Sequence, residues 1–333
     1  MPGRGRAAGR GPGGGARVIK DVAYAEADPA GGRGHLLDLY LPEERAVPGA
    51  PRPLVIWSSG SAWLSDDGKA GAEEAARHFT AAGFAVAGVS VRSSSQARFP
   101  AQLHDVKAAV RFLRAGADRF GLDPERFAIM GNSSGGWVAA MAAVTSGMPE
   151  LEGEVGVRGP SSRVQAAVDF YGPTDFLRMD EHMPPGARER FNAMMRTTDG
   201  HNDPRSPESR LVGAPVQEHP DEVRRADPTR YAARGTPPLL LLHGQADPLV
   251  PENQSALLFE AVRRAGGRAT FHSLPGVGHE HPYVTDPARA AGQTVRWTED
   301  GRDGVVADAP PPTWETIERF VRKALRLPEP ATR

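Results

Sequence analysis

The segment that most constrains the fold of this chain is residues 126–141, RFAIMGNSSGGWVAAM. An apolar run at residues 127–130 leads straight into a Gly-Asn-Ser-Ser-Gly-Gly turn, and an Ala-rich segment with high helix propensity follows. A buried strand can pass into a helix through so short a turn only where the residues between them are small. The segment therefore predicts a strand, a sharp turn and a helix in direct succession.

Short apolar runs bounded by Gly or Pro recur along the whole chain. Those with the length of buried strands are residues 54–57, 85–89, 127–130, 166–170, 239–242 and 270–274. Between them, apolar residues repeat at helical spacing in residues 103–113 and 258–265, and a last helix is expected after the N-cap residue Thr313. Strands that alternate with helices predict an α/β fold with a mostly parallel central sheet and helices on both of its faces.

Three segments depart from this alternation. Residues 1–16 are rich in Gly and Arg and have too little apolar surface to offset the entropy of ordering, so this head is expected to be disordered. Residues 17–327 are expected to form one domain. Within it, residues 176–234, rich in Pro, Arg, Met and Glu, predict a cap inserted over a pocket. Residues 285–312, polar and rich in Gly and Pro, predict a loop excursion on the surface.

The composition excludes several classes of function. Forty basic and 41 acidic residues give a net charge of −1, which offers no basic face to nucleic acid. The absence of cysteine excludes disulfides, thiolate catalysis and cysteine-ligated metal sites. His272, His279 and His281 lack a further ligand at matching spacing, so no metal site is predicted. No cofactor is expected, because a G-x-G-x-x-G match at residues 9–14 follows no strand and is interrupted by Pro12.

The chain shows no signal for a membrane or a secretory route. It has no run of about 18 apolar residues, and its positively charged head lacks the apolar core of a signal peptide. A protein without a membrane span and with a cytoplasmic location is the expectation. The oligomeric state stays open, with a homo-oligomer among the options.

The glycine and serine turn fits the pattern Gly-x-Ser-x-Gly at Gly131, Ser133 and Gly135. A strand that enters this pattern and leaves it as a helix strains the central serine and projects its hydroxyl out of the sheet, as a nucleophile requires. The backbone N–H of Ser134, at the start of the helix, is placed to bind a developing oxyanion. The alternative is that Gly and Ser merely build a tight turn.

Two residues further along the chain complete a catalytic set with Ser133. Asp247 follows a predicted strand in LLLLHGQADPLVP, and His279 follows the next one in LPGVGHEHP. A serine nucleophile needs a histidine base, and the base needs a carboxylate to orient it. The order serine, acid, histidine, with each residue just past a strand, predicts a triad. His281 is a rival base, but the Gly-x-Gly lead-in favours His279.

Three further polar residues are assigned structural roles. His243 is expected to make hydrogen bonds at the end of a strand, Asp175 to stabilise a turn, and Asp105 to occupy an exposed helix position.

The chain also resembles a known family in several blocks of sequence. They are VIKDVAYA, LLDLYLP, RFPAQLHDVKAAVRFLRAGADRFGLDPERFAIMGNSSGGWVAA, YGPTD, LLHGQADPLVP and LPGVGHEH. These blocks resemble bacterial α/β-hydrolase esterases of the acetyl-esterase and feruloyl-esterase-like group, relatives of the hormone-sensitive lipases. The likeness covers residues 18–327 except 285–312. It implies an α/β-hydrolase fold and a carboxylic ester hydrolase with Ser133, Asp247 and His279 as its triad.

One motif departs from that family. Its members usually carry His-Gly-Gly-Gly-Trp after the third strand, where this chain has SSGSAW, residues 58–63. Because the donors of such an oxyanion hole are backbone N–H groups, Gly60 and Ser61 are still expected to serve with Ser134, and the Ser61 hydroxyl is a further candidate donor. The alternative is a distorted hole and weak activity.

The sequence thus predicts a serine carboxylesterase that cleaves small-to-medium acyl esters through an acyl-enzyme. Trp63 and the Met- and Pro-rich cap are expected to line the substrate pocket, although the same side chains suit a packed core equally well. An amidase, aryl formamidase or serine peptidase with the same triad is one alternative, and a non-catalytic ligand-binding homologue is another. A purely structural module would leave the ordered triad unexplained.

Overall fold

The computed structural model describes residues 6–10, 16–43 and 49–329. The strands are β1 (Arg6–Arg10), β2 (Ala16–Ala23), β3 (Leu36–Pro42), β4 (Arg52–Ser58), β5 (Ala85–Val89), β6 (Leu122–Asn132), β7 (Ala166–Phe170), β8 (Leu239–Gly244), β9 (Ala269–Leu274), β10 (Gln293–Glu299) and β11 (Arg302–Ala309). The helices are α1 (Ala72–Ala81), α2 (Ala101–Ala115), α3 (Ala117–Phe120), α4 (Ser134–Val144), α5 (Ala187–Met195), α6 (Pro207–Val212), α7 (Pro220–Arg225), α8 (Asn253–Arg264) and α9 (Trp314–Ala324).

All described strands belong to one sheet with the order β1-β2-β3-β5-β4-β6-β7-β8-β9-β10-β11. The central block from β5 to β9 is parallel, and the strands at both ends pair antiparallel. The predicted mostly parallel sheet is therefore confirmed. The next two strands along the chain after β4 lie on opposite sides of it, β5 on one side and β6 on the other. In a doubly wound sheet, such a change of direction opens a crevice at the carboxyl ends of the neighbouring strands, here β4 and β6.

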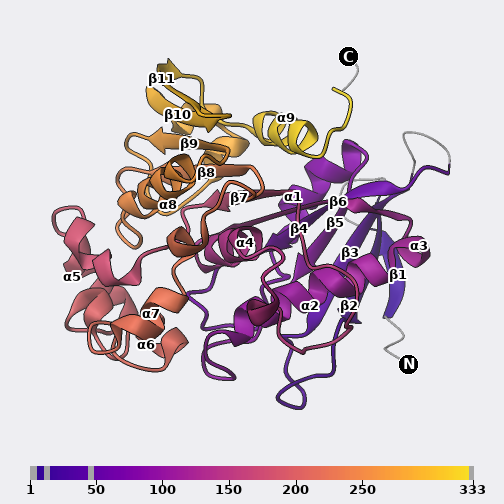
Figure 1. Cartoon of the computed structure of the whole chain (residues 1–333), viewed down its shortest axis with the longest axis horizontal. Helices are drawn as coiled ribbons and strands as arrows, with labels where there is room; N and C mark the ends of the chain where they lie inside the picture. Colours follow the sequence, from indigo (N-terminus) through magenta and orange to yellow (C-terminus); the bar gives the residue numbers. More distant parts are fainter. Residues whose placement is uncertain (1–5, 11–15, 44–48, 330–333) are drawn as a thin grey trace.

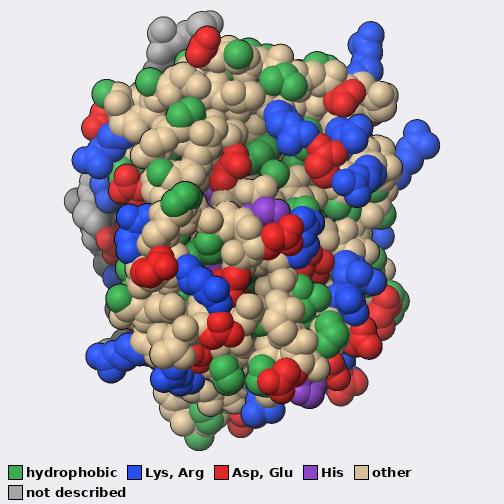
Figure 2. Space-filling model, turned by 90° about the vertical axis from the view of Figure 1, so that its left-hand side faces the viewer, with side chains coloured by type: hydrophobic (Ala, Val, Ile, Leu, Met, Phe, Trp, Pro, Cys, Tyr) green, Lys and Arg blue, Asp and Glu red, His purple; other side chains and the backbone are tan. Residues whose placement is uncertain are grey.

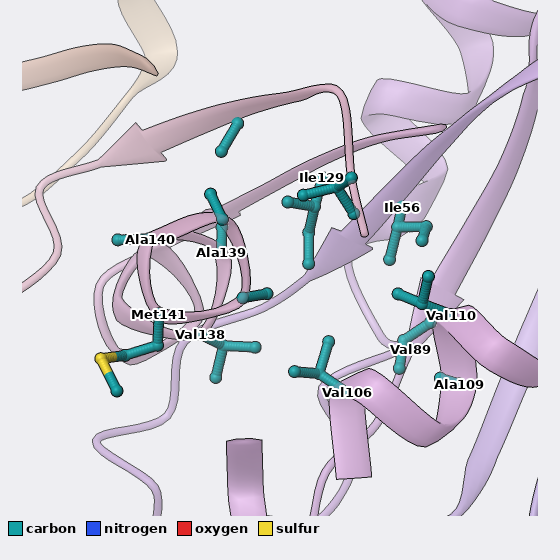
Figure 3. Close-up of a cluster of buried hydrophobic side chains, with 14 of the residues drawn as sticks. Ile56, Val89, Val106, Ala109, Val110, Ile129, Val138, Ala139, Ala140 and Met141 are labelled. Atoms are coloured by element: carbon teal, nitrogen blue, oxygen red, sulfur yellow. The ribbon is translucent and has the colours of Figure 1, made fainter. Parts of the chain in front are cut away.

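Helices cover both faces of the sheet, as the alternating pattern predicts (Figure 1). On one face, α2, α4 and α8 pack over a core that includes Leu103, Trp137 and Leu258. Figure 3 shows Val110 of α2 and Val138 of α4 in this core. On the other face, α1 and α9 meet around Trp314. Every residue of α4 is buried, because an Ala-rich helix that is apolar on all sides can be enclosed completely.

The segment 176–234, which we call the cap, carries α5, α6 and α7 together with short 3₁₀ turns and lies at one end of the molecule (Figure 1). Asp175, Ser206 and Asp227 each cap one of its turns by accepting a backbone N–H two or three residues ahead. The predicted turn role of Asp175 is thus confirmed. Trp137 of α4 donates its indole N–H to the Ala226 carbonyl at 2.7 Å, which ties the cap to the core.

The structure corrects two of the predicted boundaries. The expected surface loop at 285–312 contains the hairpin of β10 and β11, in which β10 pairs antiparallel with β9. The sequence does not predict the hairpin because β11 lacks the alternation of apolar and polar residues that marks a half-buried strand. It is an edge strand, and its apolar residues Val305 and Val306 are exposed to solvent. Within the head of residues 1–16 that is expected to be disordered, Arg6–Arg10 forms β1, whose backbone pairs with β2, and Ala16 begins β2. The rest of that prediction, residues 1–5 and 11–15, lies outside the described residues.

Asp105 is not at an exposed helix position as expected. It is fully buried on α2, where its carboxylate accepts hydrogen bonds from the Arg92 backbone and guanidinium and lies 3.1 Å from His35 Nε2. A buried carboxylate needs such partners, and both of them lie outside α2.

No helix in the described part of the chain combines the length and apolar composition that crossing a bilayer would require.

Candidate active site

Ser133 occupies the turn between β6 and α4. Its backbone has φ 54° and ψ −127°, a conformation that is strained for a residue with a side chain. The turn is possible because its neighbours have no side chain: a Cβ on Gly135 would lie 2.7 Å from the Ser58 carbonyl carbon, and one on Gly60 would lie 2.6 Å from Ser133 Cβ. The glycines thus allow α4 and the loop after β4 to approach the serine closely.

The structure brings together the three residues that the sequence singled out. His279 Nε2 lies 2.9 Å from Ser133 Oγ, and His279 Nδ1 lies 2.7 Å from Asp247 Oδ2. With Nδ1 protonated, the imidazole donates to the carboxylate and accepts from the serine hydroxyl. The three side chains come from loops after β6, β8 and β9, so they meet at the carboxyl edge of the parallel strands.

Asp247 is held from several directions. Its Oδ1 accepts the backbone N–H groups of Leu249 at 2.8 Å and Val250 at 2.9 Å. Burial would raise the pKa of the Asp247 carboxyl, but the side chains of His243 and His279 outweigh burial and hold that pKa well below its usual range. The carboxylate therefore stays ionised and fixed in position.

His243 makes the hydrogen bonds predicted for the end of β8, with Nδ1 2.8 Å from Ser255 Oγ and Nε2 2.9 Å from the Val250 carbonyl. In addition to this predicted structural role, His243 contacts the triad, because its Nε2 lies 3.3 Å from Asp247 Oδ2. Burial would lower the pKa of His243, but the Asp247 carboxylate raises it above the usual value. A second imidazole thus contacts the carboxylate that orients His279.

His281, the rival base, is directed to other partners. Its Nδ1 lies 2.5 Å from Tyr171 Oη, which in turn lies 3.4 Å from Asn132 Nδ2. Burial lowers the pKa of His281, so the ring is favoured in its neutral form and accepts a hydrogen bond from the tyrosine hydroxyl. Asn132 Oδ1 then accepts the Gly60 N–H at 3.0 Å. A chain of hydrogen bonds therefore runs from His281 to the loop after β4.

Two of the three predicted oxyanion donors are not free. The Gly60 N–H donates to Asn132, and the Ser61 N–H donates to Ser134 Oγ at 2.9 Å. The expected hole of Gly60, Ser61 and Ser134 is corrected in this respect, because the side chains on either side of Ser133, those of Asn132 and Ser134, already accept these two N–H groups. The Trp63 N–H shares Ser134 Oγ at 3.3 Å. The N–H of Ser134, at the start of α4, stays a prediction.

The other two side chains of the loop point away from Ser133. Ser59, which stands where the related family has histidine, accepts the Trp57 indole N–H at 2.8 Å and donates to the Ala70 carbonyl. Ser61 Oγ accepts the Ser65 N–H at 3.2 Å, so it is not a further donor toward Ser133. Ala62 and Trp63 adopt φ values of 53° and 55°, and this turn directs the chain along the nucleophile.

A small cavity of about 30 Å³ lies between Ser133, His279 and the cap. Trp63 lines it, as predicted, and packs edge-on against Trp137 with ring centroids 5.4 Å apart. Among the cap methionines, Met195 lines the cavity, whereas Met179 is buried in the cap and Met194 is exposed. Figure 2, which views the side of the molecule that carries the cap, shows acidic and basic side chains interspersed over this face.

Sequence reasoning missed two polar residues in the cavity wall, His201 and Glu208. Both lie in the cap, whose irregular polar composition hides any periodic burial pattern. The N-cap pattern Ser206-Pro207 could have placed Glu208 in the first turn of a helix, but nothing local indicates that this helix faces Ser133.

No group of three or more His, Cys, Asp or Glu side chains in the described ranges is arranged to hold a metal ion. His272, one member of the histidine set considered above, is buried on β9 with Nδ1 3.2 Å from Gln293 Oε1.

A mixed sheet with this crossover and a strained serine after a central parallel strand define an α/β-hydrolase fold. Comparison with known proteins agrees. The profile of the BD-FAE family matches residues 37–262, and the chain belongs to this feruloyl-esterase-like family of α/β-hydrolases.

Named relatives are similar over most of this chain. Esterase LipQ of Mycobacterium tuberculosis is 30% identical over 268 residues, 79% of this chain and 57% of its own length. Esterase LipC of the same organism is 28% identical over 259 residues, 78% of this chain and 58% of its own length. The chain thus spans somewhat more than half the length of these relatives.

Solved structures share the fold. A truncated carbohydrate esterase from gut microbiota is 34% identical, with a TM-score of 0.70 over 85% of this chain and 96% of its own. The propionate-bound esterase Est2 of Thermogutta terrifontis is 26% identical, with a TM-score of 0.57 over 80% of this chain and 85% of its own.

Proposed function

We propose that this protein is a serine carboxylesterase that hydrolyses esters of small acyl groups. The observation that carries the proposal is the alignment of Ser133 Oγ, His279 and Asp247 through contacts of 2.9 and 2.7 Å. The names of the relatives, esterases and a carbohydrate esterase, support an ester substrate. The cavity of about 30 Å³ beside the serine favours the small end of the predicted acyl range.

The proposed reaction has two steps. Ser133 Oγ attacks the ester carbonyl while His279 Nε2 takes its proton, and the same imidazolium returns the proton to the leaving alcohol. Water then attacks the acyl-serine while His279 Nε2 takes its proton. The imidazolium returns this proton to Ser133 Oγ as the acid leaves. Asp247 orients the imidazole and stabilises its charge in both steps.

The oxyanion of each tetrahedral intermediate needs donors close to Ser133. We assign this role to the backbone N–H groups of Ser134 and Ala62, supported by the start of α4 at Ser134 and by the position of Ala62 in the cavity wall. The Ser134 hydroxyl, which accepts two N–H groups from the loop, retains a proton that it can donate to the oxyanion.

The test is hydrolysis of p-nitrophenyl acetate, butyrate and decanoate by wild type and by Ser133→Ala. We expect turnover of the acetate to exceed that of the decanoate, because the cavity holds only a small acyl group. We expect kcat to fall by about 10⁴-fold or more in Ser133→Ala, because the nucleophile is lost.

The matched control is Ser146→Ala, which removes the same kind of hydroxyl two residues past the end of α4, where Ser146 Oγ donates to the Ala142 carbonyl at 3.1 Å. It should retain wild-type turnover. An enzyme that cleaves p-nitroacetanilide but none of the esters would instead support the amidase alternative. A folded wild type without any turnover would support the non-catalytic homologue.

A further inference from the structure

His201 and Glu208 form a buried polar pair on the cap side of the cavity. His201 is 1% exposed and Glu208 is 3% exposed, and His201 Nδ1 lies 3.1 Å from Glu208 Oε2. His201 is fixed by its backbone N–H, which donates to Asp180 Oδ1 at 3.1 Å, and by the Phe191 ring, whose centroid is 3.9 Å away. The pair therefore has a defined position in the pocket that contains Ser133.

The charges of the pair balance each other. Burial would lower the pKa of the His201 imidazole, but the Glu208 carboxylate outweighs burial and the pKa is raised. Because the Glu208 carboxylate favours the protonated form of the His201 imidazole, opposite charges offset each other within the pair, which suits a neutral polar group better than an ammonium or a carboxylate.

The described residues use only part of the hydrogen-bonding capacity of the pair. Although Glu208 Oε2 is within ion-pair distance of His201, it has no hydrogen bond of good geometry to any described residue. The cavity wall that it shares also contains the apolar side chains of Phe191, Met195 and Val250. A buried carboxylate oxygen without a hydrogen bond is costly, so it needs an explanation in a ligand or in function.

We propose that Glu208 and His201 form a recognition subsite for a hydroxyl group of the substrate. Such a hydroxyl donates to Glu208 Oε2 and can accept from an N–H group of the His201 ring, which satisfies both partners at once. The inference rests on the proposed ester hydrolysis and narrows its substrates to hydroxylated esters. Because the cavity holds about 30 Å³, the hydroxyl belongs to a small group close to the ester carbonyl.

The hydroxyl has two chemical sources, the acyl part and the alcohol part of the ester. Three substrates of nearly equal size separate them: ethyl acetate, ethyl glycolate with a hydroxyl on the acyl side, and 2-hydroxyethyl acetate with a hydroxyl on the alcohol side. Acid release is followed by titration at constant pH, and each kcat/KM is divided by the rate constant of hydroxide-catalysed hydrolysis. This division removes the intrinsic reactivity of each ester.

We expect this corrected kcat/KM of wild type to be about 10-fold or more higher for one of the two hydroxylated esters than for ethyl acetate. A hydrogen bond to a buried charged group gives a preference of this size. Glu208→Gln should bring this ratio down to about 1, because an amide replaces the charged acceptor while keeping its size. Arg210→Gln, on the exposed side of the same helix α6, is the control and should keep the wild-type ratio.

Two results would overturn the subsite while leaving the proposed function in place. One is a wild type whose corrected kcat/KM values for the three esters lie within 2-fold of one another. This measurement needs no variant, so it tests the subsite even if Glu208→Gln does not fold. The other is a Glu208→Gln variant that slows all three esters equally, as a purely structural role predicts. A folded wild type that cleaves no ester would overturn the proposed function, and the subsite with it.

Discussion

Ser134 links the nucleophile turn to the loop after β4 through one hydroxyl. Its Oγ accepts the N–H groups of Ser61 at 2.9 Å and Trp63 at 3.3 Å, while its backbone begins α4. The same residue thus shapes the loop that carries Ala62. This contact is not visible from the Gly-x-Ser-x-Gly pattern, in which the side chain of residue 134 is unspecified.

Replacement of Ser134 by Ala is expected to lower kcat for p-nitrophenyl acetate by about 10- to 100-fold, because the variant loses one hydroxyl donor and the anchor of the loop. The N–H of residue 134 remains, so some activity should persist, unlike in Ser133→Ala. Steady-state kinetics with circular dichroism as a check of folding would measure this. A kcat within 2-fold of wild type would show that the hydroxyl has no part in oxyanion binding.

At the scale of elements, the site depends on loops that follow four different strands. Tyr171, just past β7, joins three of them, because its hydroxyl contacts His281 after β9 and Asn132 at the end of β6, which holds Gly60 after β4. Its ring also lies 4.5 Å from the His279 ring, measured between centroids. The tyrosine is therefore placed to set the relative positions of the base and the oxyanion loop.

Tyr171→Phe keeps the ring beside His279 but removes the hydroxyl that joins the loops. We expect kcat to fall by about 10-fold with little change in KM, because misplaced catalytic groups weaken transition-state binding more than ground-state binding. Tyr231→Phe is the matched control, since that hydroxyl donates to the Arg225 carbonyl within the cap. Equal losses in the two variants would contradict a positioning role for Tyr171.

The elements differ in how far the sequence predicts them. The parallel strands and the helices α2, α4, α8 and α9 follow from apolar runs and helical spacing, since each buries a face defined by its own residues. The hairpin of β10 and β11 was predicted as a loop. Val305 is 66% exposed, and an edge strand with solvent on its faces has no burial pattern from which to recognise it.

At the scale of the whole molecule, one buried group links stability to pH. Asp169, at the carboxyl end of β7, is 1% exposed, and its Oδ1 accepts the Gly172 N–H at 2.8 Å. Burial raises the pKa of its carboxyl to about 7, while the Gly172 N–H acts in the opposite direction. Asp169 Oδ2 has no hydrogen-bond partner among the described residues.

Between pH 4 and 7 the folded chain therefore holds a proton on Asp169 that the unfolded chain has released, since an unfolded aspartate has a pKa of about 3.9. The free energy of unfolding should fall as the pH rises through this range, with the loss complete above about pH 7. Asp169→Asn cannot ionise and keeps the acceptor for Gly172. Its stability relative to wild type should grow by about 2–3 kcal/mol from pH 5 to pH 9.

Urea unfolding of both proteins at several pH values measures this difference. Asp221→Asn, at a carboxylate whose side chain is 92% exposed, is the control and should show a much smaller pH-dependent difference. A difference between wild type and Asp169→Asn that stays constant from pH 5 to pH 9 would contradict a raised pKa for Asp169.

The sequence by itself determined the α/β architecture, the sharp turn at Ser133 and the positions of Asp247 and His279 after successive strands. These features depend on local patterns of apolar, glycine and polar residues, which act over a few neighbours. Only the tertiary structure decided that Asn132 and Ser134 occupy the N–H groups of Gly60 and Ser61, and that His201 and Glu208 face the cavity. Those contacts join segments about 70 or more residues apart, so packing of the sheet, the loops and the cap determines them rather than any local pattern.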